Sequence, residues 1–418
     1  MTTAVGIDLS VVGRGHFDPR GRTGLYRVTV ELVRALVSNP ALELVPFAGV
    51  LRGEAQAELD HLGVSLEVRR GRLERALFPL VYRWAQASQS RDVALTRSRR
   101  RVLRTVTDAL EALPSRRAPR SVEAVSAVVH FPYDPPSAFG FEPGQGAIKL
   151  VTVHDLLPLT HPQYFGRDAG RLLRRVVRDV RAGAWAHCIS HATRDALLEL
   201  VPAAEERVFV AHLAAHPQRF YVPGQAAVRE TVRRHDLGPY LLCLGTLDAR
   251  KNLGLAFAVF EALASDHPEL QLALVGAPSR QSDEWKRLSA RYAAIASRVV
   301  RLGFVEDREL PALYRGARAF LFPSHAEGFG LPVLEALQCG AAVVSSDATS
   351  LPEVAGDAAV TVSPRDLEAW VDAVAGMLDS DRAAAWRRKG PPRAAAFTWE
   401  KTGEHLAAAY RRAASATA

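Results

Sequence analysis

With 418 residues, the chain is too long for one compact core and suits two domains of about 200 residues each. Its apolar content of 48% is enough to fill two cores, and its formal net charge is +8. No stretch approaches the roughly 18 apolar residues of a membrane-spanning helix, and no basic region typical of a secretory leader precedes the first expected strand. The three cysteines are isolated and lack paired spacing, so a reduced, cytoplasmic setting is expected.

Short β-rich runs alternate with amphipathic stretches along the whole chain. This alternation predicts an α/β fold in which parallel sheets are covered by helices. A helix is expected over residues 26–38, directly after a loop that ends in Gly24. Strands are expected in the first half at residues 4–9, 44–47, 127–131, 148–152 and 187–189.

The second half continues the alternation, with strands expected at residues 240–245, 271–275, 299–302, 319–322, 342–345 and 359–362. Prolines and Gly224 interrupt regular structure over residues 216–238, which places a domain boundary there. The sequence therefore predicts an N-terminal domain over residues 1–220, a C-terminal domain over residues 221–397 and a last helix within residues 398–418.

A glycine-rich segment over residues 324–340 carries Glu327 and Glu335, eight residues apart. An apolar run before it predicts a buried strand, and Pro332 suits the first position of a helix, so Glu335 is expected in the first turn. Exposed N–H groups at a helix start favour phosphate, and carboxylates accept hydrogen bonds from sugar hydroxyls. The segment therefore predicts a site for a sugar nucleotide.

Two adjacent cations, Arg250 and Lys251, follow a strand that is expected to end at Gly245. Open α/β sheets bind ligands at the carboxyl ends of their strands, and the two cations match the two phosphates of a nucleotide sugar. A dipeptide of this kind is also compatible with a solvated pair on a turn.

These motifs together resemble the retaining GT-B glycosyltransferases of the family-4 type, whose hallmark is a Glu-x7-Glu motif. The resemblance implies two Rossmann-like domains facing each other across a cleft. It also implies transfer of a hexose from a nucleotide-sugar donor, which is a substrate and not a cofactor. No metal is expected, because neither an Asp-x-Asp pair nor metal-ligand spacing is present. The segments that carry the resemblance are residues 151–156, 245–252, 274–276, 303–305 and 322–362.

The resemblance also assigns roles to single residues. Glu327 would face the donor hexose, Glu335 would hold the ribose, and the backbone beside Gly276 and Val305 would wall the base. The catalytic residues it implies are Glu327, His154, Arg250 and Lys251. The donor-binding residues it implies are Gly24, Gly245, Thr246, Gly276, Val305, Gly328, Phe329, Gly330, Leu331 and Glu335. Many family members have Arg where this chain has Thr246, so phosphate binding is expected to depend more on Arg250 and Lys251.

Several first-half residues are open to more than one interpretation. His154, at a strand end, is expected to orient the donor, and Asp155 either holds its imidazole or caps the turn. Ser190 is expected to cap a helix, and residues 130–134 are expected to shape the acceptor pocket. Gly24 is expected to begin a helix whose N–H groups approach the diphosphate. Three other glycines compete with it for this role: Gly13, Gly15 and Gly21.

The sequence leaves the substrates open. GDP-mannose is the first choice of donor, because the motifs around His154 and Arg250 resemble bacterial mannosyltransferases, with UDP-linked and other GDP-linked hexoses as alternatives. The acceptor is a glycan, a lipid-linked glycan or a small molecule. A non-catalytic sugar-nucleotide-binding protein and a GT-B epimerase remain alternatives, whereas an oxidoreductase is disfavoured because no Gly-x-Gly-x-x-Gly follows the first strand.

Residues 69–120 are strongly basic, with fourteen Arg and no Lys against four acidic residues. Basic charge beside aliphatic and aromatic groups such as Trp84 suits an anionic membrane surface. The expectation is a cytoplasmic protein that binds the inner face of the membrane peripherally, with a solvated Arg-rich insertion as the alternative. Nucleic-acid binding is not expected, because no recognition fold accompanies the charge.

Overall fold

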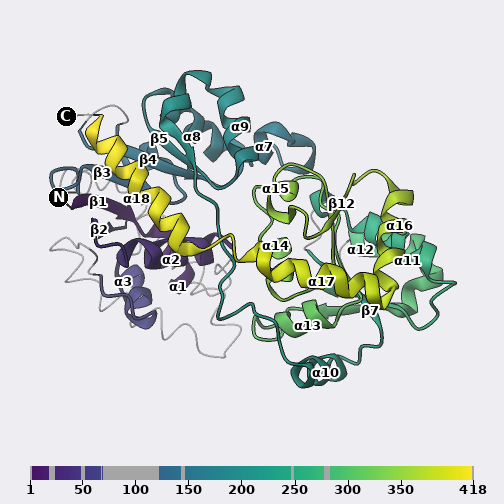
Figure 1. Cartoon of the computed structure of the whole chain (residues 1–418). Helices are drawn as coiled ribbons and strands as arrows, with labels where there is room; N and C mark the ends of the chain where they lie inside the picture. Colours follow the sequence, from purple (N-terminus) through teal and green to yellow (C-terminus); the bar gives the residue numbers. More distant parts are fainter. Residues whose placement is uncertain are drawn as a thin grey trace, which may run out of the picture.

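The computed structural model describes residues 2–17, 24–48, 52–66, 68, 122–142, 146–245, 249–276 and 283–416. The first half forms a six-stranded sheet in the order β2-β1-β3-β4-β5-β6, and every pairing in it is parallel (Figure 1). The strands are β1 (Thr3–Asp8), β2 (Leu42–Phe47), β3 (Val128–Phe131), β4 (Ile148–Val153), β5 (Trp185–Cys188) and β6 (Val208–Val210). The α-helices are α1 (Ser10–Phe17), α2 (Gly24–Val37), α3 (Arg52–His61), α7 (Leu157–Thr160), α8 (Arg171–Arg181) and α9 (His191–Leu200). Short 3-10 helices are η2 (Pro136–Phe139), η3 (Pro162–Tyr164) and η4 (Pro202–Arg207).

The second half forms another parallel six-stranded sheet, in the order β12-β11-β10-β7-β8-β9. Its strands are β7 (Tyr240–Leu244), β8 (Gln271–Val275), β9 (Val299–Gly303), β10 (Ala319–Phe322), β11 (Val343–Ser346) and β12 (Val360–Val362). The first helices are α10 (Gln225–Arg234), η5 (Ala249–Lys251), α11 (Leu253–Leu263), α12 (Asp283–Arg291), η6 (Ala293–Arg298) and α13 (Leu310–Gly316). The later helices are α14 (Leu331–Gln338), α15 (Leu351–Ala355), α16 (Leu367–Leu378), α17 (Ser380–Ala394) and α18 (Trp399–Ser415).

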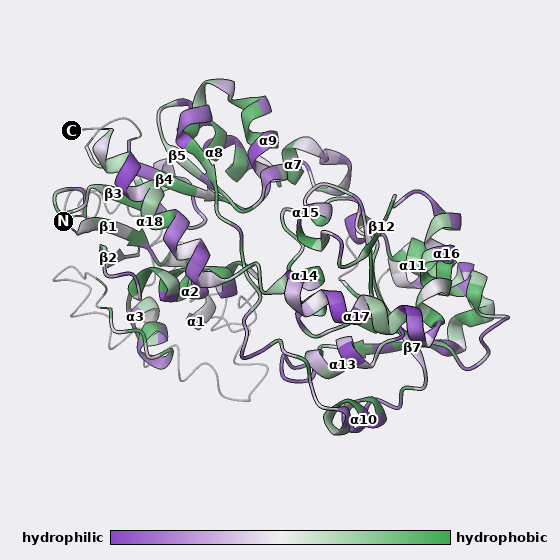
Figure 2. Cartoon of the chain, in the orientation of Figure 1, coloured by the Kyte–Doolittle hydropathy of each residue, from purple (hydrophilic) through white to green (hydrophobic). Residues whose placement is uncertain are grey.

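The predicted α/β fold with two parallel sheets is confirmed. Strands β10 and β11 are buried along their whole length, because helices cover both faces of the sheet. This burial explains the continuous apolar sequence of β10, whereas β11 ends in two buried serines, Ser345 and Ser346. Figure 2 shows the hydrophobic residues concentrated on strands and the hydrophilic ones on helices such as α17 and α18. The three cysteines are free and buried, and no described helix is both long and apolar enough to cross a bilayer.

Two parts of the first half differ from the expectation. The edge strand β6 was not expected, because it has only three residues and follows a proline-led 3-10 helix. The region of Gly13 and Gly15 forms helix α1, so these two glycines do not belong to a phosphate-binding loop. A Cβ on Gly15 would lie 2.2 Å from the ring of Tyr26, so this glycine serves the close packing of α1 against α2.

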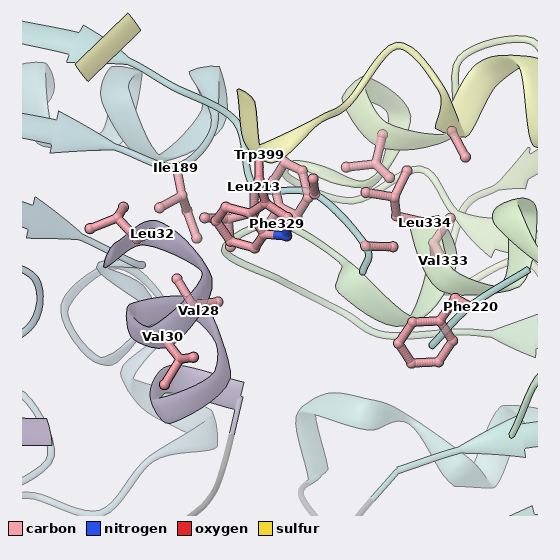
Figure 3. Packing of buried hydrophobic residues seen from close by; sticks show 14 of the residues in the cluster. Val28, Val30, Leu32, Ile189, Leu213, Phe220, Phe329, Val333, Leu334 and Trp399 are labelled. Carbon is pink, nitrogen blue, oxygen red and sulfur yellow. The ribbon is translucent and has the colours of Figure 1, made fainter. Parts of the chain in front are cut away.

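The chain crosses between the two halves twice. The first crossing lies between β6 and α10 and the second between α17 and α18, and the predicted boundaries at residues 220 and 397 fall in these connections. The final helix α18 returns to the first sheet (Figure 1), where the Tyr410 hydroxyl lies 2.7 Å from His130 Nδ1. Around the crossings, apolar side chains from both halves pack together, among them Leu213, Phe329 and Trp399 (Figure 3).

Candidate active site

The centre of the site lies where strands β7 and β10 end. These strands are parallel neighbours, so their carboxyl ends lie at one edge of the sheet. The turn after β7 supplies Arg250 and Lys251, and the loop after β10 supplies Glu327. One Glu327 oxygen lies 2.7 Å from Arg250 Nη1, and the other lies 2.7 Å from Lys251 Nζ. All three side chains are at most 16% exposed, so this is a buried charge cluster and not a solvated turn.

The electrostatics of this cluster favour an anionic ligand. Burial raises the pKa of Glu327, but Lys251 and Arg250 lower it by more, so the pKa lies below its usual value. Glu327 is therefore ionised at neutral pH. The Asp155 carboxyl lies near enough to interact with both Arg250 and Glu327. Two cations at a strand end can make charge-assisted hydrogen bonds to a diphosphate.

The glycine loop after Glu327 brings the two halves into contact. A Cβ at Gly328 would lie 2.2 Å from the backbone oxygen of His154, which belongs to the first half, so this position requires glycine. Gly330 has a φ of 106°, in the left-handed region, and leads directly into α14. The helix begins at Leu331, so Glu335 is its fifth residue and not part of its first turn, as had been expected.

Glu335 occupies a different environment from Glu327. Its carboxylate accepts a hydrogen bond of 3.2 Å from the Tyr314 hydroxyl. Burial raises the pKa of Glu335 to about 8, although Arg27 and the Tyr314 hydrogen bond act in the opposite direction. With this pKa, the Glu335 carboxyl group is mostly protonated at pH 7. A hydroxyl group that donates a hydrogen bond to the carboxylate would stabilise the ionised form and lower the pKa.

His154 is held as a neutral imidazole. Its Nε2 lies 2.7 Å from the backbone oxygen of Pro132, and because a carbonyl only accepts, Nε2 carries the proton. Burial lowers the pKa of His154 to about 4. Asp155 caps the turn by accepting from the Leu157 N–H at 3.0 Å, so of its two expected roles the structure shows the cap. His154 can therefore orient a donor through Nδ1 without bringing a positive charge.

The other predicted donor residues fall into several places. Gly276 has a φ of 71° and lies against the Gly245 carbonyl, so both border the end of β7. Gly24 is the first residue of α2 and Leu331 the first of α14. Val305 is buried, but its neighbour Phe304 is 87% exposed, which excludes a core role for Phe304. Thr246 and Gly21 lie outside the described residues.

The structure corrects the expected ligand contacts of Phe329 and of residues 130–134. The Phe329 side chain is 3% exposed and packs against Phe397, so only the backbone of Phe329 can meet a donor. Within residues 130–134, His130 and Phe131 are fully buried in β3, and His130 is hydrogen-bonded to Tyr410 and Thr152. They belong to the core and do not line an acceptor pocket.

Sequence reasoning missed a set of contacts between the halves. Arg27 of α2 forms a 2.8 Å ion pair with Asp307, close enough to Glu335 for both to affect its pKa. Glu353 of α15 accepts from the backbone N–H of His191 at the start of α9. The motif around Glu353 was visible in the sequence, but nothing local indicated its partner.

One group among the described residues has metal-like spacing, namely His191, His212 and Glu353, whose candidate ligand atoms lie within 4.8 Å of one another. The Glu353 carboxylate already accepts hydrogen bonds from the His191 backbone and contacts His212 Nε2. These contacts satisfy the carboxylate with protein donors alone, so the group is explained as a hydrogen-bonded contact between the halves.

The two parallel six-stranded sheets, each covered by helices, have the architecture of a GT-B glycosyltransferase. The chain is 31% identical over 272 residues to the Escherichia coli O-antigen chain mannosyltransferase B, covering 63% of this chain and 70% of that protein. Residues 238–380 match a family model described as "Glycosyl transferases group 1". The chain therefore belongs to the group 1 glycosyltransferases.

Other similarities agree with this assignment. A serotype-specific mannosyltransferase WbdA from Escherichia coli is 31% identical over 229 residues, which is 53% of this chain and 28% of that protein. Anabaena HepE in complex with UDP shares the fold with a TM-score of 0.66 and 15% identity, covering 97% of this chain and 99% of that one. Sucrose-phosphate synthase from Thermosynechococcus elongatus shares it with a TM-score of 0.64 and 19% identity over 99% of both chains.

Proposed function

We propose that this chain transfers a mannosyl group from GDP-mannose to a hydroxyl group of a glycan, a lipid-linked glycan or a small molecule, with retention of anomeric configuration. The observation that carries the proposal is the buried cluster of Glu327, Arg250 and Lys251 at the sheet edge. The choice of mannose rests on the similarity of this chain to the Escherichia coli proteins named as mannosyltransferases.

The cluster suits the departure of a nucleoside diphosphate. As the glycosidic bond breaks, negative charge grows on the leaving phosphate, and we assign the stabilisation of this charge to Arg250 and Lys251. These cations supply the positive charge that a metal ion would otherwise provide, so we infer a metal-independent reaction. In a retaining transfer, the leaving phosphate can itself accept the proton of the incoming hydroxyl. The neutral His154 then serves to orient the donor.

The two glutamates have separate tasks in this proposal. Glu327 lies with the phosphate-binding cations, next to the loop that contacts His154, and would face the donor hexose. Glu335 lies in α14 beside Tyr314 and would accept hydrogen bonds from the ribose hydroxyls. A carboxylate has enough lone pairs to accept from two neighbouring hydroxyls at once.

The donor is tested by thermal shift with GDP-mannose, GDP-fucose, UDP-glucose, UDP-galactose and the free nucleotides GDP and UDP. A ligand present at about 100 times its dissociation constant stabilises a protein by about 2.7 kcal/mol, which is a readily measured shift in Tm. The proposal expects the largest shift in Tm with GDP-mannose. It also expects slow cleavage of GDP-mannose, detected as free GDP. A UDP-sugar as the best ligand would contradict the donor assignment, and binding without any turnover would favour a non-catalytic sugar-nucleotide-binding protein.

A further inference from the structure

The loop that carries Glu327 is held from both sides. Within its own half, the Thr349 hydroxyl lies 2.8 Å from both the N–H and the carbonyl oxygen of Glu327. Ser350 Oγ lies 2.9 Å from the carbonyl oxygens of Glu327 and Phe329. Both hydroxyls stand at the start of α15, so this helix start fixes the first and third carbonyls of the loop.

The carbonyl between them belongs to Gly328 and is bound by the other half. Ser190 Oγ lies 2.7 Å from the Gly328 oxygen, and Thr193 Oγ1 lies 3.2 Å from it. Ser190 is also the N-cap of α9, where it accepts from the Thr193 N–H at 3.1 Å. A hydroxyl can accept through its lone pairs while it donates its proton, so Ser190 serves both contacts.

Glu353 accepts further hydrogen bonds from the first half, at the start of α9. From α15, its carboxylate oxygens lie 2.9 and 3.0 Å from the His191 N–H, and one of them is 3.5 Å from the Ala192 N–H. A carboxylate at a helix N-terminus is stabilised by the unsatisfied N–H groups and the helix dipole. The start of α9 therefore donates hydrogen bonds to two acceptors of the second half, the Gly328 carbonyl and the Glu353 carboxylate.

We propose that Ser190, Thr193 and Glu353 are positioning residues for glycosyl transfer, which lock the two halves together and thereby set the backbone position of Glu327. The inference rests on the proposed role of Glu327. The contact with Gly328 is tight, because the His154 backbone fills the space where a side chain would begin. A shift of the Gly328 carbonyl therefore moves the neighbouring Glu327 relative to Arg250, Lys251 and the donor. The site is complete only when the halves are docked.

The test measures GDP release from GDP-mannose by Thr193→Val, Ser190→Ala, their double variant and Glu353→Gln. Thr193→Val removes one hydroxyl without removing a cap. A geometric error at the reacting centre lowers kcat, so each single hydroxyl variant should lose about tenfold in kcat and the double variant about 100-fold, with little change in KM. The matched control is Asp366→Ala, which removes the N-cap of α16 without contacting the loop and should keep wild-type kcat. Thr193→Ser should restore activity.

A double-mutant cycle with Glu327→Gln separates positioning from a general structural role. If the hydroxyls act through Glu327, then Ser190→Ala and Thr193→Val should cause no further loss of kcat in the Glu327→Gln background. Additive losses, a loss confined to KM, or an equal loss in Asp366→Ala would overturn the inference. If Glu327→Gln alone keeps wild-type turnover, the proposed role of Glu327 fails, and the positioning inference fails with it.

A second measurement does not depend on the donor. Amide hydrogen exchange over residues 324–331 reports how firmly the loop is held. The Ser190→Ala/Thr193→Val variant should exchange faster there than the wild type and than Asp366→Ala. Unchanged exchange in this segment would show that the hydroxyls do not hold the loop, whatever the kinetics.

Discussion

The two halves of this enzyme share an architecture, but they contribute to the site in different ways. In the second half, Arg250, Lys251 and Glu327 meet directly at the ends of two neighbouring strands. In the first half, His154 supplies mainly a backbone contact and a neutral ring, and α9 supplies hydroxyls to a loop of the other half. In the proposed function, the second half thus supplies the charged groups of the reaction, whereas the first half fixes the position of the loop that carries Glu327.

The largest expected effect comes from the cations of the second half. Replacing Lys251 or Arg250 by Ala should cost about 2 to 4 kcal/mol of transition-state stabilisation, because each cation is expected to face the departing diphosphate. Each substitution also removes one of the two ion-pair partners of Glu327. Turnover of GDP-mannose measures this. Arg171→Ala, an exposed ion-pair residue of the first half, is the control and should behave as wild type. Wild-type turnover in both cation variants would remove the phosphate assignment.

The two glutamates should separate in steady-state kinetics. Glu327→Gln should chiefly lower kcat, because its contacts are with the groups around the reacting centre. Glu335→Ala should chiefly raise KM for the donor, because a ribose contact is equally strong before and during the reaction. The reverse pattern would exchange the two roles.

Two glycine variants compare the tight contact between the halves at Gly328 with an open surface position at Gly224. Gly328→Ala should destabilise the protein by about 1 to 3 kcal/mol and impair turnover, because its Cβ would overlap the His154 backbone. Gly224→Ala, which meets nothing within 4 Å, should leave both unchanged. Thermal unfolding and turnover check both variants. If Gly328→Ala changed neither thermal unfolding nor turnover, the halves would not dock this closely in solution.

The pH dependence of donor binding should report on Glu335. Its pKa is raised to about 8 without donor, so below this pH the group is mostly protonated. Ribose hydroxyls that donate to the ionised form lower that pKa, so binding releases a proton and donor affinity rises with pH, by up to about tenfold per unit, until it levels near pH 8. Isothermal titration across pH 6 to 9 measures this. Glu335→Gln should remove the slope, and a slope that persists in this variant belongs to another group.

The smallest effect is expected from the basic residues 69–120, all of which lie outside the described residues. Sedimentation with vesicles of graded anionic lipid content should show binding that grows with anionic lipid and weakens with salt. The absence of binding to strongly anionic vesicles at low salt would leave a solvated insertion as the explanation. Either result leaves the donor-side chemistry unchanged.

The sequence predicted the second half more completely than the first for a physical reason. Its strands β7 and β10 are buried and read as clear apolar runs, and its site residues follow on the ends of these two strands, where topology brings them to one edge. The short strand β6 and the helix α1 with its two glycines lack such signals. The hydrogen bond from Ser190 to Gly328 joins residues 138 positions apart, and no local pattern of sequence encodes such a contact.

The most direct test of the central claim is the anomeric configuration of the product. With the donor selected by thermal shift and an acceptor that supports turnover, NMR of the purified product gives the configuration at the transferred sugar's anomeric carbon. The account predicts the same configuration as in the donor, because Glu327, Arg250 and Lys251 are assigned to a retaining transfer with a departing diphosphate. A product with inverted configuration would contradict that mechanism and the roles derived from it.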